Sequence, residues 1–251
     1  MSKDRISINV LWTGGLDSTY LVARLAMGYD CNIQPYYIMD EGRASTRNEI
    51  DAITKITESI RHKENVRGVV LDPIMVRKRD IIPDSGITKA WKSLNKRYSI
   101  GIQYEFIARF AKEKGICLAV GVMCDDRSKI AKPVEAEEKS VVMNELGGYY
   151  RIQCLNDDCG PVLKNMLFPV FMWKKKKTEE WKELMALGLE DVASMTWFCH
   201  TPILGMPCGH CNPCKDALAE GMSFRVPFLG RILYYVIRLP ESLIKYVLRI
   251  K

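Results

Sequence analysis

The stretch Val10-Leu11-Trp12-Thr13-Gly14-Gly15-Leu16-Asp17-Ser18-Thr19-Tyr20 decides the fold of this chain of 251 residues. Apolar and polar residues alternate over residues 6–10, as in a β-strand, and apolar residues recur at helical spacing over residues 21–26. The stretch therefore predicts a strand-to-helix turn. Its two glycines permit a tight turn and a close approach to a ligand, and the free N–H groups at the start of the helix favour phosphate.

The side chains of this turn add to its phosphate-binding character. Thr13, Ser18 and Thr19 supply hydroxyl groups. The carboxylate of Asp17 repels phosphate, and it suits a magnesium ion that the phosphates share. The stretch lacks the lysine of a P-loop and the glycine spacing of a dinucleotide fold. The alternative interpretation is a strand–turn–helix corner whose glycines serve packing only.

The composition indicates a globular protein. Hydrophobic residues make up 47% of the chain and charged residues 27%, which is ordinary, and the length suits one α/β domain with an appendage. The N-terminus leads directly into the first strand, so we expect no signal peptide. The sequence contains no apolar run of about 18 residues, so we expect no membrane-spanning helix. Nine cysteines without a secretory signal indicate a reducing compartment, with metal binding or free thiols.

Strands and helices are predicted to alternate along the chain. Further strands are expected at residues 33–39, 66–71, 116–122 and 167–173, and helices from Thr46, at 102–111 and at 178–187. Thr46 and Glu49 are expected to form a capping box. The basic residues 73–98, with two prolines and a glycine, are interpreted as a long excursion over the ligand site. This order predicts an α/β fold with a parallel, doubly wound, Rossmann-like sheet whose ligand lies beyond the carboxyl ends of the strands.

Several charged residues follow the predicted strands. The acidic or thiol side chains expected along the crevice are Asp40, Glu41, Cys124, Asp125 and Asp126, although each also suits a solvated loop or a helix cap. Four lysines, Lys174 to Lys177, precede the helix at 178–187. Such a run is usually a solvated face, and the alternative is that one lysine faces the phosphates.

Four cysteines near the C-terminus predict a zinc site. Cys199, Cys208, Cys211 and Cys214 have the spacing C-x8-C-x2-C-x2-C, and two C-x2-C turns direct sulfurs toward one ion. Four thiolates would close the ligand shell, so we expect a structural zinc. His200 and His210 stand beside these ligands and are expected to be neighbours of the site. The alternative is a chance cluster of free thiols.

These two motifs carry a resemblance to a known family. The turn resembles the S-G-G-x-D-S-T loop of the ATP pyrophosphatases (PP-loop superfamily), with Thr13 in place of the first serine. Together with T-W-x-C-x8-C-G-x-C-x2-C and a lysine-rich segment between Pro169 and Glu179, it resembles the 7-cyano-7-deazaguanine synthase family over residues 6–220.

The resemblance implies a fold, an activity and site residues. The fold is the adenine nucleotide alpha hydrolase type. The activity is an ATP-dependent ligase that adenylates the carboxylate of 7-carboxy-7-deazaguanine, uses ammonia to form the amide and then the nitrile, and so feeds queuosine biosynthesis. ATP and Mg²⁺ are held by Thr13, Gly14, Gly15, Leu16, Asp17, Ser18 and Thr19, with Asp17 and Ser18 as the catalytic residues. Zn²⁺ is held by the four cysteines.

The sequence departs from the family at two segments that face the acceptor substrate. Residues 96–100 and 125–130 have lost most of the family's pattern, while the ATP and zinc motifs are retained. One alternative is therefore a relative that activates another carboxylate, in polysaccharide or defence chemistry. A tRNA-modifying PP-loop enzyme and a non-catalytic zinc module that binds a membrane or a protein are further alternatives. Nucleic acid is the less favoured partner, because no basic surface interleaved with aromatic residues is evident.

The C-terminal tail lies outside the resemblance. Residues 222–251 contain six basic residues and one acidic residue, a surplus of five within the chain's net charge of +7. Three of the basic residues, Arg231, Arg238 and Lys245, repeat every seven positions among apolar residues. The pattern predicts binding to a membrane surface or a partner protein, and the alternatives are packing onto its own domain or across a homodimer.

The predicted organisation has three parts. Residues 1–195 form the ATP-binding domain, 196–220 the zinc segment and 221–251 the basic tail. We expect a cytoplasmic protein, with the tail at the inner membrane face as an additional location.

Overall fold

A computed structural model describes residues 5–123, 128–136, 139–143, 146–152 and 159–235. Its centre is a sheet in which five strands run parallel in the order β3-β2-β1-β5-β8. Their bounds are β1 (Ile6–Leu11), β2 (Cys31–Met39), β3 (Val69–Val70), β5 (Leu118–Val120) and β8 (Met166–Pro169). The predicted α/β class and the parallel sheet are confirmed.

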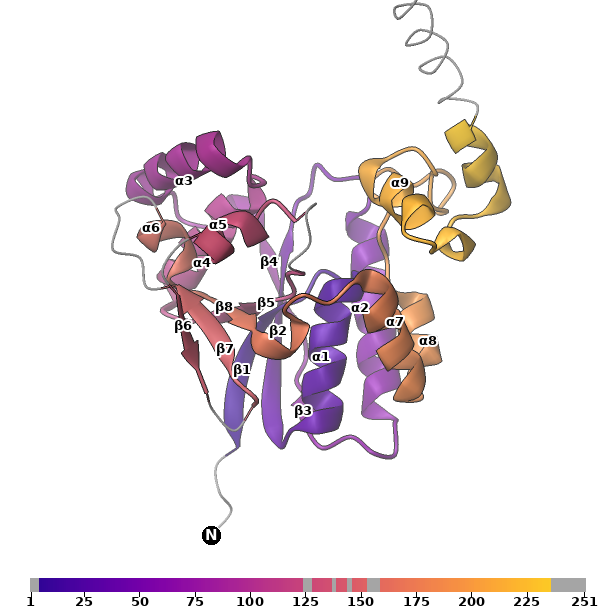
Figure 1. Cartoon of the computed structure of the whole chain (residues 1–251), viewed down its shortest axis with the longest axis horizontal. Helices are drawn as coiled ribbons and strands as arrows, with labels where there is room; N and C mark the ends of the chain where they lie inside the picture. The colour runs from indigo at the N-terminus through magenta and orange to yellow at the C-terminus, as the bar shows by residue number, and fades with distance from the viewer. Residues whose placement is uncertain (1–4, 124–127, 137–138, 144–145, 153–158, 236–251) are drawn as a thin grey trace, which may run out of the picture.

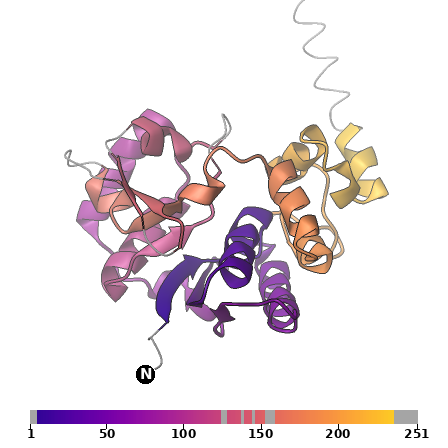
Figure 2. The ribbon, with the colours of Figure 1, turned by 60° about the horizontal axis from the view of Figure 1, so that its bottom comes forward.

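Helices cover both faces of the sheet. On one face lie α1 (Leu16–Gly28), α2 (Thr46–Arg61), α7 (Lys177–Ala186) and α8 (Glu190–Met195), which contact one another. On the other lie α3 (Ser85–Tyr98), α4 (Gln103–Lys114) and α6 (Gly160–Leu163). Figures 1 and 2 show these groups on opposite sides of the sheet, and each packs on its own buried apolar cluster. The sheet is therefore doubly wound.

The segment 73–98 is the largest error of the sequence interpretation. It contains β4 (Ile74–Arg77), which pairs parallel with β2, a short 3-10 turn (Lys78–Asp80) and the helix α3. The side chain of Asp84 caps α3 by accepting a hydrogen bond from Ile87 N at 2.9 Å. The segment therefore builds the second helical layer, and none of it lines the large cavity described below.

Smaller predictions are corrected as well. The strand expected at 66–71 is shorter than predicted and consists of β3 (Val69–Val70) alone. The strand expected at 167–173 ends at Pro169, and the 3-10 turn Val170–Met172 follows it. Two antiparallel strands, β6 (Lys139–Val142) and β7 (Tyr149–Ile152), extend the sheet beyond β8 and were not expected.

The predicted capping box at the start of α2 is wrong. The hydroxyl of Thr46 donates to Asp40 O at 2.7 Å, and Glu49 accepts instead from the hydroxyl of Ser45 at 2.7 Å. The remaining short elements are α5 (Ala131–Ala136), α9 (Asn212–Ala219) and the 3-10 turn Ser223–Arg225.

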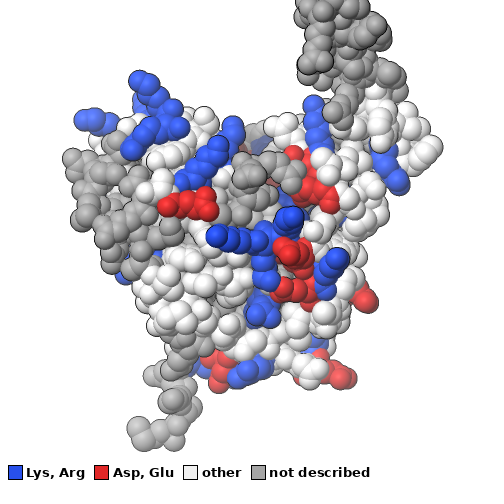
Figure 3. All heavy atoms as spheres, viewed as in Figure 1, with Lys and Arg blue, Asp and Glu red and all other residues white. Residues whose placement is uncertain are grey.

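The outer surface of α3 is basic. Lys89, Lys92, Lys96 and Arg97 are all exposed, and Figure 3 shows the group at the upper left of the molecule. Within the described residues, no helix combines the length and the apolarity that a membrane crossing requires.

Candidate functional site

A cavity of about 410 Å³ opens at the carboxyl ends of β1, β2 and β5. In the sheet, β1 lies between β2 on one side and β5 on the other. The strand order therefore reverses direction at β1. Ligands of open α/β sheets bind in the crevice at such a reversal. The volume lies within the usual range for small-molecule sites, about 300–1,000 Å³.

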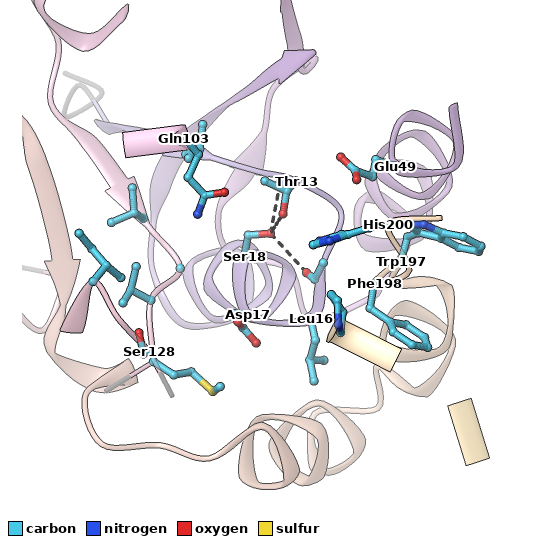
Figure 4. A pocket seen from close by; sticks show the side chains of 18 of the residues that line it. Thr13, Leu16, Asp17, Ser18, Glu49, Gln103, Ser128, Trp197, Phe198 and His200 are labelled. Atoms are coloured by element: carbon cyan, nitrogen blue, oxygen red, sulfur yellow. Dashed lines mark hydrogen bonds between the residues drawn. The ribbon is translucent and has the colours of Figure 1, made fainter. Parts of the chain in front are cut away.

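The β1–α1 turn forms the floor of the cavity. Thr13, Gly15, Leu16, Asp17 and Ser18 all line it. The Ser18 hydroxyl accepts from Thr13 N at 3.2 Å, lies 3.1 Å from Thr13 Oγ1 and donates to Gly15 O at 3.3 Å (Figure 4). These bonds fold the loop around the start of α1. The helix N-terminus therefore faces the cavity, as the sequence predicts.

Two residues of the predicted set support the loop from outside the cavity. Thr19 is fully buried, and its hydroxyl accepts from Trp12 Nε1 at 2.9 Å. Gly14 has φ +71°, and a Cβ there would lie 3.0 Å from Glu49 O, against α2. Both residues shape the turn, and neither lines the cavity.

Gly121 is a position of the candidate site that was not predicted from the sequence. It follows β5 and lines the cavity. A Cβ at this position would lie 2.7 Å from Ser18 Cα and 2.9 Å from the carbonyl carbon of Asp17. The end of β5 can approach the first turn of α1 only because residue 121 has no side chain. The only sequence signal was a glycine at a predicted strand end.

Positive charge enters the cavity from two distant parts of the chain. Lys177, in the first turn of α7, is the member of the lysine run that lines the cavity. Burial lowers its pKa, but the carboxylates of Asp17, Glu220, Asp216 and Glu180 outweigh burial and raise the pKa overall. Lys177 is therefore charged at neutral pH, and one lysine of the run lines the cavity, whereas the phosphate that it was expected to face stays a prediction.

Arg225 is the second cation. Its Nη2 donates to Thr196 O at 2.8 Å and to Thr196 Oγ1 at 2.6 Å, and its guanidinium lies 4.5 Å from the centroid of the Phe198 ring. Burial lowers its pKa to about 10, so it remains charged at neutral pH. The sequence analysis placed Arg225 in the tail, and no motif marked it as part of a site.

A second polar corner faces the loop from α2 and the cysteine segment. Glu49 accepts from the hydroxyls of Tyr37 and Ser45, each at 2.7 Å, and Arg43 also lines this corner. His200 lies beside the loop on the same side as Glu49, and Gln103 and Ser128 lie on the opposite side (Figure 4). Burial, and then the charge of Arg43, lower the pKa of His200, so the imidazole is neutral at pH 7.

Of the residues expected along the crevice, the two that the structure describes, Asp40 and Glu41, do not line the cavity. Asp40 pairs with Lys78 at 3.1 Å, and Glu41 pairs with Arg79 at 3.3 Å. Cys124, Asp125 and Asp126 lie outside the described residues. Of the two divergent segments, 96–100 lies at the end of α3 away from the cavity, whereas Ser128 and Ile130 of the second segment line it.

The four predicted zinc ligands come together. The Sγ atoms of Cys199, Cys208, Cys211 and Cys214 all lie within 4.8 Å of one another. The pairs 208–214 and 199–211 are both separated by 3.9 Å. A tetrahedral ion with Zn–S bonds of about 2.3 Å would place its sulfurs about 3.8 Å apart. The cluster therefore has the geometry of a four-thiolate metal site.

Backbone N–H groups also point at the sulfurs of the cluster. Cys208 N donates to Cys199 Sγ at 3.3 Å, and Cys211 N donates to Cys208 Sγ at 3.4 Å. Such bonds stabilise thiolate charge and orient the ligands. His210 Nδ1 lies 3.3 Å from Cys208 O, and neither His200 nor His210 belongs to the ligand cluster of the described chain.

The cysteine segment touches the β1–α1 turn directly. Trp197 N donates to Gly14 O at 2.8 Å, and a Cβ on Gly15 would lie 3.5 Å from Trp197 O. Trp197, Phe198 and His200 all line the cavity. The two motifs recognised in the sequence therefore belong to one site. Comparison with protein-family models and with curated proteins finds no match.

Proposed function

We propose that this chain is an ATP-dependent carbon–nitrogen ligase of the PP-loop type, resembling 7-cyano-7-deazaguanine synthase. The observation that carries the proposal is the convergence of the Thr13–Ser18 turn, Asp17, Lys177 and Arg225 on one cavity. Backbone N–H groups and two cations suit a pyrophosphate, and a carboxylate beside them suits its magnesium ion.

The residues would divide the chemistry as follows. The first-turn N–H groups of α1 and the hydroxyls of Thr13 and Ser18 bind the β- and γ-phosphates, and Asp17 holds Mg²⁺, which supplies charge neutralisation when bound. The acceptor carboxylate attacks the α-phosphorus, and the bond to pyrophosphate breaks. Lys177 and Arg225 stabilise the negative charge that develops on the departing pyrophosphate.

Ammonia would then attack the acyl carbon, so that AMP leaves and an amide remains. A second ATP activates the amide oxygen, and loss of that oxygen with AMP yields the nitrile. Zn²⁺ bound by the four cysteines has a structural role, because four thiolates leave no open coordination position.

A second candidate is a PP-loop enzyme that adenylates a different carboxylate, in polysaccharide or defence chemistry. The observation that favours it is the position of Ser128 and Ile130, which bring a divergent segment to the cavity wall. A tRNA-modifying enzyme would use the basic outer surface of α3, with Lys89, Lys92, Lys96 and Arg97. Nucleic acid stays the less favoured partner, because that surface lies away from the cavity residues.

The remaining proposals concern partners and location. We place the protein in the cytoplasm, with a homodimer as one assembly. The described part of the tail is helical from Phe228 to Tyr235, and these two residues are 69% and 63% exposed. That apolar surface suits the proposed contact with a partner protein or with the inner membrane face.

The proposed reaction class predicts its products. With Mg²⁺, ATP, ammonia and an accepted carboxylate, the protein should release AMP and pyrophosphate, and Asp17→Asn should lower that rate by roughly 10²-fold or more because it removes the charged metal ligand. Chromatography of the nucleotides measures both. Asp51→Asn, on the exposed face of α2, is the matched control. ADP and phosphate as the products would contradict the assignment.

The acceptor is tested separately. Given 7-carboxy-7-deazaguanine, ATP and ammonia, the protein should form a nitrile that mass spectrometry detects, and omission of ammonia should stop the reaction. Nitrile formation at the background rate together with normal ATP binding would favour the second candidate. The β1–α1 turn would then be intact, and the cavity wall near Ser128 would exclude this acceptor.

A further inference from the structure

Glu180 is a buried acidic residue that the proposed function does not use. It lies in the first turn of α7, one turn from Lys177, and is 0% exposed. Helix α7 packs against α1, which carries Asp17 in its own first turn. The two carboxyl groups lie within hydrogen-bonding range of each other. Sequence reasoning missed the pair because the two residues are far apart in the chain.

The oxygen atoms of this pair lack donors. Three oxygen atoms of the pair are buried: both carboxylate oxygens of Glu180 and Oδ1 of Asp17. In the part of the chain that the structure describes, none of the three accepts a hydrogen bond. Two ionised carboxylates can only accept hydrogen bonds, so they cannot satisfy each other. Burial, and then the charge of Asp17, raise the pKa of Glu180 well above its usual range.

A purely structural role does not account for Glu180. A buried carboxylate without a donor destabilises the fold, and an apolar or amide side chain of similar size would fill the same space without that loss. Among the described residues, Lys177 makes no ion pair within 4.0 Å with either carboxylate, although the charges of both raise its pKa, and its side chain lines the cavity. Without an ion, the raised pKa of Glu180 allows a proton to bridge the two carboxyl groups, and a cation bound between them would take the place of that proton.

We propose that Asp17 and Glu180 together form a divalent-cation site, with Glu180 as the second carboxylate ligand beneath the phosphate cavity. Mg²⁺ is commonly held by one or two carboxylates together with substrate phosphates. Asp17 lines the cavity on the side of Ser18 opposite to Thr13 (Figure 4), and Glu180 lies in the first turn of α7, which packs against α1. The role of this ion in catalysis rests on the proposed function, whereas the site itself does not.

The test uses the metal alone on full-length, zinc-loaded protein without ATP. Mn²⁺, which is paramagnetic, replaces Mg²⁺ and is titrated by electron paramagnetic resonance, with Mg²⁺ as the competitor. We expect one competable Mn²⁺ per chain, and Glu180→Gln should weaken its binding at least 10-fold, in the range found when groups that support a metal are removed. Glu179→Gln removes the same charge from the same helical turn and should leave the affinity unchanged.

Thermal unfolding gives a second readout. Without a divalent ion, Glu180→Gln should be at least as stable as the wild type, because an amide can donate to Asp17. With Mn²⁺ in excess, the melting temperature of the wild type should rise, since a ligand of the folded state stabilises it, and that of Glu180→Gln should not.

The outcomes separate this inference from the proposed function. Wild-type affinity in Glu180→Gln, or no Mn²⁺ binding by the wild type, overturns the site, even if AMP release persists. Glu180-dependent Mn²⁺ binding without release of AMP supports the site and counts against the ligase.

Discussion

Replacing Cys211 with serine should remove zinc from the protein and abolish its cooperative thermal unfolding transition. The four sulfurs lie within 4.8 Å of one another and leave no alternative ligand inside the cluster. Structural zinc contributes about 10–16 kcal/mol in isolated zinc-binding peptides, whereas the net stability of a whole domain is about 5–15 kcal/mol. The free energy of stabilisation lost with the ion should therefore be as large as the net stability of the whole domain.

Metal analysis of freshly purified protein measures the first effect, and calorimetry measures the second. Cys117→Ser is the matched control, because Cys117 is a partly exposed free thiol outside the cluster. We expect one zinc per chain in the wild type and in the control. A wild type without zinc, or a Cys211→Ser variant that unfolds like the wild type, would show that the cluster is a group of free thiols.

The second large effect is expected at Gly121. In Gly121→Ala the new Cβ would lie 2.7 Å from Ser18 Cα and 2.8 Å from Ser18 N. Both are backbone atoms, so either the end of β5 or the first turn of α1 has to move. Overpacking of this kind costs about 1–3 kcal/mol, and a displacement of about 1 Å in a site that positions reactants can lower a rate by about 10²-fold.

Calorimetric titration with Mg-ATP and thermal unfolding together measure this change. Gly28→Ala, at the end of the same helix, is the control, because an added Cβ there meets no atom within 4 Å. We expect the control to bind ATP normally. If Gly121→Ala also binds ATP normally, the first turn of α1 is not the phosphate site.

The sequence predicted the parts of this protein that depend on local chemistry. The turn at residues 13–18 and the cluster of four cysteines were identified because short spacings set their geometry. The helix α3 was missed because Pro83 and Gly86 were interpreted as breakers of regular structure. In the structure Gly86 lies in the first turn, where backbone N–H groups have no helical partner, and Asp84 caps the helix.

The residues that the sequence analysis missed in the site depend on tertiary packing. Glu180 meets Asp17 only because α7 packs on α1, and Arg225 reaches the cavity through its bonds to Thr196. The early part of the predicted tail also belongs to the body of the protein, since Val226 is fully buried in the main core. A truncation that tests the tail should therefore end after Tyr235 and not at Gly221.

The hydrogen bond from Trp197 N to Gly14 O has a consequence for synthesis of the protein on the ribosome. The β1–α1 turn is translated long before Trp197, whose N–H group holds its backbone. Domains generally fold as units during synthesis, once their contacting segments have emerged. The nascent chain therefore carries an incomplete turn until the cysteine segment leaves the exit tunnel, so that assembly of the thiol cluster and completion of the turn become late, coincident events.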